Sequence, residues 1–76
     1  LAEYCVCNSD QIAKKSNKLT FTESASIALA GGTSLQSLKY FGKLEGKNVL
    51  IIGASGGCGS LGIQIAKALG ASKVTG

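Results

Sequence analysis

Seven consecutive residues in the C-terminal half have the types and the spacing needed to bind a phosphate group: Gly53-Ala54-Ser55-Gly56-Gly57-Cys58-Gly59. Within this run, Ala54-x-Gly56-x-x-Gly59 places small residues where a chain must turn tightly out of a strand and enter a helix. Without a side chain at Gly56 the backbone can approach a pyrophosphate, and without one at Gly59 helix and strand can pack closely. The amides near Gly57 and Cys58 would then face phosphate oxygens at the positive end of the helix dipole.

The segments on either side of this turn fit the elements that such a site requires. Residues 49–52 form an aliphatic run typical of a parallel strand that is buried on both faces. After the turn, an apolar face recurs at helical spacing, and Gln64 and Lys67 lie opposite it. This face comprises Cys58, Leu61, Gly62, Ile65, Ala68 and Leu69. Gly70 suits the left-handed end of that helix, and residues 73–75 begin a second strand.

The order strand, glycine-rich turn, helix and strand predicts a βαβ unit. It belongs to the α/β class and is typical of the Rossmann fold, a doubly wound parallel sheet. The ligand that this unit favours is a dinucleotide, with its pyrophosphate against the turn.

Other interpretations of the glycine-rich turn have less support. Gly57-x-Gly59-x-x-Gly62 also matches the glycine pattern, but it begins inside the helix. A Walker A loop is excluded because no Gly-Lys-Ser or Gly-Lys-Thr ends the turn. Residues 53–57 match the Gly-x-Ser-x-Gly turn of hydrolases, yet the chain contains no histidine to act as the base. A hydrolase whose histidine lies elsewhere and a turn without any ligand stay as alternatives.

The half of the chain before the strand predicts a helix with a defined start. Thr20 and Glu23 fit a capping box, which would begin a helix at Phe21 and carry it to about Leu29. The pair Gly31-Gly32 would end this helix because glycine is a poor helix former.

A second helix is expected after the glycine pair. Thr33 or Ser34 would cap it, and its apolar residues would be Leu35, Leu38 and Phe41. Before the capping box we expect extended chain over residues 1–6 and 11–13, a turn at residues 8–10 and a polar loop at residues 14–18.

Composition argues against several classes of partner. The net charge of +4 comes from scattered lysines without a dense basic tract, which does not favour nucleic-acid binding. No uninterrupted apolar run exceeds four residues, so no segment is expected to span a membrane.

The three cysteines of the chain, Cys5, Cys7 and Cys58, lack the spacing of a zinc site. We interpret Cys5 and Cys7 as half-buried strand residues, with a redox pair as the alternative. Reduced thiols and the absence of a signal peptide indicate an intracellular compartment.

Nearly the whole chain resembles the medium-chain dehydrogenase/reductase superfamily, and it is most similar to the zinc-free quinone oxidoreductase branch. The turn and its flanks resemble the cofactor domain of that family. Residues 29–38 look like its Leu-x-Gly-x-Thr-Ala-x-x-Ala-Leu segment. The matching stretches, in chain order, are residues 2–4, 19–25, 29–38, 49–59 and 64–71.

The resemblance implies hydride transfer from NADPH or NADH, with NADPH favoured, to a quinone, an enone or a related carbonyl compound. It places seven residues at the cofactor: Thr33 near the nicotinamide, and Ala54, Ser55, Gly56, Gly57, Cys58 and Gly59 at the pyrophosphate. No catalytic residue is assigned within this chain. No metal site is assigned either, because zinc alcohol dehydrogenases carry a cysteine ligand where this chain has Leu29. The alternatives are such an alcohol dehydrogenase, an enoyl reductase module, and a non-catalytic dinucleotide-binding protein.

The resemblance also implies how the chain is organised. Residues 1–19 would end a GroES-like catalytic domain, residues 20–46 would be linking helices, and residues 47–76 would begin the Rossmann domain. We therefore expect a piece of a longer, homo-oligomeric protein located in the cytoplasm, with an organelle as the alternative. Cys58 stands where the family usually has valine, and its place on the apolar face predicts a buried, inert thiol. The prolines usual around Lys14, Ser16 and Glu45 are absent.

Overall fold

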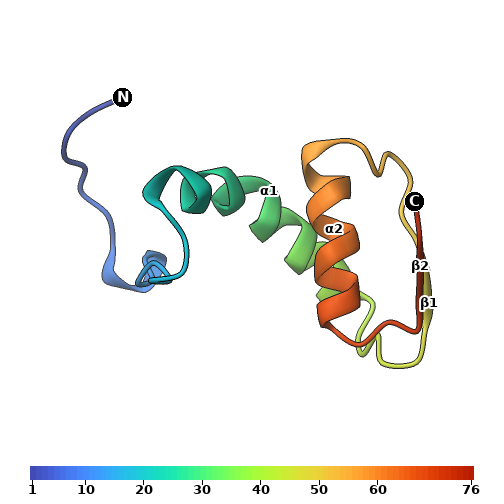
Figure 1. Ribbon diagram of the computed structural model, residues 1–76. Coiled ribbons are helices and arrows are strands. Elements are labelled where there is room, and N and C mark those ends of the chain that lie inside the picture. The colour runs from blue at the N-terminus through green and yellow to red at the C-terminus, as the bar shows by residue number, and fades with distance from the viewer.

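The glycine-rich turn joins the first of two parallel strands to the helix that connects the two strands. The structure, a computed structural model, describes all residues 1–76. In chain order its elements are η1 (Ser9–Gln11), α1 (Phe21–Tyr40), β1 (Asn48–Leu50), α2 (Gly57–Ala68) and β2 (Lys73–Thr75). Figure 1 shows α1 and α2 crossing on the same side of the two strands. The predicted α/β class and βαβ unit are confirmed.

The two strands pair in parallel, and their register leads towards the turn. Asn48, Val49 and Leu50 lie opposite Lys73, Val74 and Thr75 respectively. The amide of Ile51 also donates to the Thr75 carbonyl at 2.8 Å, which extends the pairing by one residue. Both strands therefore end at the edge of the sheet where the chain turns into α2.

The core is aliphatic and covers only one face of the sheet. Its buried residues are Leu38, Leu44, Ala66 and Ala71, with Val49, Ile51, Ile65, Leu69 and Val74 packed against them. The prediction that the first strand is buried on both faces was wrong. Leu50 is 69% exposed and Ile52 91% exposed, because no element covers the face opposite α2.

Helix α1 begins as predicted, with a complete capping box. The Glu23 amide donates to the Thr20 hydroxyl at 3.1 Å, and the Thr20 amide donates to the Glu23 carboxylate at 3.0 Å. The bond from the Thr20 backbone, followed by the contact with its side chain, holds the pKa of Glu23 below its ordinary value. This box fixes where the linking segment enters α1.

The glycine pair does not break α1, contrary to the prediction. The helix passes through Gly31 and Gly32 and ends at Tyr40, so one helix replaces the two expected linking helices. Gly31 is buried at the crossing with α2, where a β-carbon would lie 3.8 Å from Leu61 Cδ1. Close packing of the two helices offsets the cost of about 1 kcal/mol that glycine brings to a helix interior.

Neither residue expected to cap a second helix has that role. Thr33 donates its hydroxyl to the Leu29 carbonyl, four residues earlier in α1, at 3.0 Å. Ser34 is buried and bonds to a different element. Leu38 is buried as the apolar spacing predicted, Leu35 is half-buried, and Phe41 is 71% exposed.

Helix α2 follows the predicted course with three differences in its buried face. Gly70 has a φ of +91°, which confirms the left-handed end of the helix. Gln64 and Lys67 are exposed as expected. Cys58 and Ala68 are also exposed, whereas Ala66, which the spacing did not single out, is completely buried.

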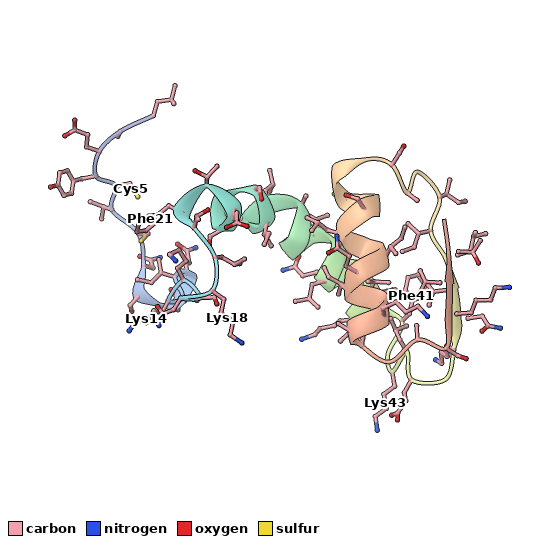
Figure 2. The ribbon with its side chains drawn as sticks, viewed as in Figure 1. Cys5, Lys14, Lys18, Phe21, Phe41 and Lys43 are labelled. Carbon is pink, nitrogen blue, oxygen red and sulfur yellow. The ribbon has the colours of Figure 1, made fainter.

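The first twenty residues lie at the N-terminal end of α1, away from α2 and the strands (Figure 2). No strand forms at residues 1–6. The extended segment expected over residues 11–13 is wrong at Gln11, which belongs to η1, whereas Ile12 has extended backbone with φ −122° and ψ 153°. Near the start of α1, the Lys15 ammonium donates to the Leu19 carbonyl and lies 5.1 Å from the centre of the Phe21 ring. Neither helix is both long and apolar enough to cross a membrane.

Candidate dinucleotide-binding site

The turn after β1 is closed by hydrogen bonds of its own backbone. Gly53 has a φ of +77°, a conformation that residues with a β-carbon rarely adopt. The Gly56 amide donates to the Gly53 carbonyl at 3.1 Å, and the Ser60 amide donates to the Gly56 carbonyl at 2.8 Å. Gly56 is the N-cap of α2 and has no side chain to satisfy the first amides of the helix.

Three amides at the start of α2 therefore have no partner in the protein. They are those of Gly57, Cys58 and Gly59, none of which donates a hydrogen bond within the chain. The first amides of a helix have no carbonyl partner inside it, and the helix dipole adds a positive partial charge there. Together they form a donor set suited to the oxygens of an anion.

The two glycines of the fingerprint have different surroundings. A β-carbon on Gly59 would overlap the Gly53 carbonyl oxygen and lie 2.7 Å from Ala54 Cα. The same atom on Gly56 would meet only that carbonyl oxygen, at 3.4 Å. The fold itself thus requires glycine at position 59, whereas position 56 has room for a β-carbon.

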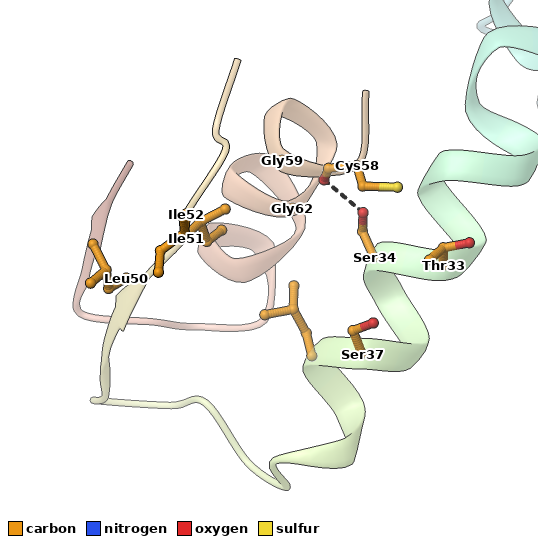
Figure 3. Close-up of a pocket in the computed structure, with 10 residues that line it drawn as sticks. Thr33, Ser34, Ser37, Leu50, Ile51, Ile52, Cys58, Gly59 and Gly62 are labelled. Carbon is orange, nitrogen blue, oxygen red and sulfur yellow. Dashed lines mark hydrogen bonds between the residues drawn. The ribbon is translucent and has the colours of Figure 1, made fainter. Parts of the chain in front are cut away.

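Next to the turn is a cavity of about 240 Å³ between α1, α2 and the end of β1 (Figure 3). It brings Thr33 of α1 together with two residues of the turn, Cys58 and Gly59. The lining residues are Thr33, Ser34, Ser37, Leu38, Leu50, Ile51, Ile52, Cys58, Gly59 and Gly62. The other four residues predicted at the site, Ala54, Ser55, Gly56 and Gly57, belong to the turn but do not line this cavity.

One residue of the site was missed by reasoning from sequence. The Ser34 hydroxyl donates to the Cys58 carbonyl at 2.7 Å and so connects α1 to the first turn of α2. Figure 3 shows this bond beside the cavity. The two residues are 24 positions apart, and patterns among neighbouring residues in the sequence do not predict a contact at that separation.

Curated proteins similar to this chain are oxidoreductases by name. A 2-methylene-furan-3-one reductase of Solanum lycopersicum is 44% identical over 75 residues, which cover 97% of this chain and 19% of that protein. The mitochondrial NAD(P)H oxidoreductase RTN4IP1 of Mus musculus is 37% identical over 76 residues, covering 93% of this chain and 19% of that protein. An alcohol dehydrogenase of Geobacillus stearothermophilus is 41% identical over 73 residues, covering 96% of this chain and 21% of that protein.

The chain belongs to the medium-chain dehydrogenase/reductase superfamily. It spans about a fifth of the length of the curated relatives that it matches, and so corresponds to one segment of such a protein. No protein-family profile matches the chain, and no solved structure gives a significant match.

Two positions bear on the chemistry that this member of the superfamily can support. Cys58 is exposed in the cavity wall, so the prediction of a buried thiol packed into the sheet was wrong. Figure 3 shows its side chain directed from the first turn of α2 towards α1 and not towards the strands. Leu29 is 84% exposed and offers no donor atom to a metal. No group of three or more His, Cys, Asp or Glu side chains lies close enough together to hold a metal ion.

Proposed function

We propose that this segment is the pyrophosphate-binding part of an NAD(P)H-dependent oxidoreductase that transfers hydride to enones, quinones or related carbonyl compounds. In this proposal residues 1–19 end the catalytic domain, residues 20–46 link the domains, and residues 47–76 begin the cofactor domain. NADPH is the proposed donor. The nicotinamide supplies the hydride, and the residues of this segment bind and orient the cofactor.

The unpaired amides at the start of α2 are the observation that carries the proposal. Gly57, Cys58 and Gly59 carry three backbone donors without a partner, beside a turn in which Gly56 has no side chain. We assign the pyrophosphate to these amides together with the backbone of Ala54 and Ser55. The adjacent cavity, with Thr33 on its wall, is the proposed approach to the nicotinamide.

The names of the relatives support the substrate class. One relative is an NADPH-dependent alkenal/one oxidoreductase of Arabidopsis thaliana, 39% identical over 75 residues, and the tomato relative is a furanone reductase. Both names describe reductases of unsaturated or carbonyl compounds. We propose the cytoplasm as the location, with an organelle as the alternative that the mitochondrial and chloroplastic relatives support.

The proposal is tested by steady-state oxidation of NADPH by the full-length protein with a panel of enones, alkenals and quinones. We expect turnover with at least one of these classes, and weaker turnover with NADH. Binding of NADPH without turnover on any acceptor would instead support a non-catalytic dinucleotide-binding protein. Absence of both binding and turnover would exclude the proposal.

Alcohol dehydrogenase activity is the second candidate, because one relative bears that name. The zinc-dependent form is disfavoured by Leu29, which stands where such enzymes have a cysteine ligand. We therefore expect the activity of the full-length protein to survive exhaustive treatment with a chelator. The measurement is the turnover rate before and after chelation, with metal analysis of the treated protein. Loss of turnover that zinc restores would revive the alcohol dehydrogenase candidate.

A further inference from the structure

The hydroxyl of Ser34 is the only side-chain donor that reaches the first turn of α2 from another element. Ser34 is 6% exposed, and its oxygen lies 2.7 Å from the Cys58 carbonyl oxygen. Gly62 of α2 lies next to this hydroxyl, and a β-carbon there would be 4.0 Å from both Ser34 Cβ and Ser34 Oγ, an ordinary van der Waals distance. The contact is therefore a part-buried hydrogen bond between two helices, with a buried donor, Ser34, and an acceptor in an exposed residue, Cys58.

The carbonyl that accepts this bond belongs to the same peptide group as one of the unpaired amides. The Cys58 carbonyl and the Gly59 amide are joined by one planar, trans peptide bond, so the oxygen and the amide hydrogen point in opposite directions. A hydrogen bond to the oxygen fixes the plane of this group. It also polarises the group, which makes the amide a stronger donor.

We propose that Ser34 is a positioning residue for the phosphate-binding turn. From α1, its hydroxyl holds the peptide between Cys58 and Gly59 so that the Gly59 amide points at the pyrophosphate of the cofactor. The inference rests on the proposed function, because it assigns Ser34 to the same site. Ser34 itself touches neither the phosphate nor the nicotinamide in this role, and it acts only through the backbone of α2.

The test compares three variants of the full-length protein with the wild type. Ser34→Ala removes the hydroxyl, Ser34→Thr keeps it, and Ser26→Ala is the matched control. Ser26 is on the same helix, but its hydroxyl bonds only to the Glu23 carbonyl within α1. Calorimetry gives the Kd for NADPH and for ADP-ribose, which retains the pyrophosphate but lacks the nicotinamide. Kinetics with an enone at saturating NADPH gives kcat and the KM of the acceptor.

We expect Ser34→Ala to raise the Kd for NADPH and for ADP-ribose by the same factor, about two- to fivefold, because one donor bond is weakened and none is removed. Any change in its kcat at saturating NADPH, or in its KM for the acceptor, should be smaller than the rise in Kd. Ser34→Thr should restore both affinities, and Ser26→Ala should change neither. Three results would overturn the inference: a rise in Kd for NADPH but not for ADP-ribose, a rise in the KM of the acceptor as large as the rise in Kd, or an unchanged Kd for both ligands in Ser34→Ala. If wild-type protein binds neither ligand, the proposed function itself fails, which is a distinct result.

Discussion

Replacing Gly56 with valine in the full-length protein is expected to weaken NADPH binding by at least about 100-fold, which corresponds to roughly 2.7 kcal/mol. The side chain would occupy the space through which the turn must approach the pyrophosphate. Folding should be little affected, because a β-carbon at this position meets only the Gly53 carbonyl oxygen, at 3.4 Å. Gly56 also has extended backbone, with φ −76° and ψ 172°, which valine adopts readily. The measurement is calorimetric titration with NADPH, together with the melting temperature.

The matched control is alanine at Gly59, which should have the opposite effect. There a β-carbon would overlap the Gly53 carbonyl oxygen and approach Ala54 Cα to 2.7 Å, so the turn or the start of α2 must move. We expect Gly59→Ala to lower the melting temperature clearly, whereas Gly56→Val leaves it near the wild-type value. Unchanged affinity in Gly56→Val would show that the assignment of the pyrophosphate to this turn is wrong.

The isolated 76-residue chain is expected to show no measurable reduction of enones or quinones by NADPH. Its affinity for the cofactor should be no tighter than roughly 1 mM. The chain supplies one βαβ unit, and in the proposed function this unit would form a single wall of the crevice for the nicotinamide. Only seven of its 76 residues are buried and no large side chain is completely buried, so little apolar burial opposes the conformational entropy of the chain.

The comparison is made at equal molarity with the full-length protein, by NADPH oxidation and by titration. Circular dichroism and light scattering on the short chain would report partial folding and self-association, which the exposed Leu50 and Ile52 favour. Turnover by the 76 residues comparable to that of the full-length protein would mean that the site is complete within this segment.

The features that sequence predicted well are those governed by local chemistry. The capping box of Thr20 and Glu23, the left-handed Gly70 and the strand–turn–helix order each depend on a few neighbouring residues. The glycine fingerprint could be placed for the same reason, because strand, turn and helix follow one another in the chain. The assignment of cofactor contacts to its residues stays a prediction.

The features that sequence missed depend on contacts between distant elements. The glycine pair was expected to end a helix, but the crossing with α2 stabilises a continuous α1 and buries Gly31. The bond between Ser34 and Cys58 joins residues 24 positions apart, so neither residue shows it locally. Cys58 matched the helical spacing of the apolar face, but a residue in the first turn of a helix can lie beyond the surface that its neighbours cover.

The unequal surroundings of Gly56 and Gly59 also determine how such a site would be lost during divergence. Glycine at position 59 is demanded by the fold, so a descendant that keeps the βαβ unit must keep it even after its ligand is abandoned. Position 56 loses its constraint together with the ligand, and larger residues can then accumulate there. A related chain that keeps glycine at the position of Gly59 but has a bulky residue at the position of Gly56 would therefore indicate a Rossmann unit that no longer binds a dinucleotide.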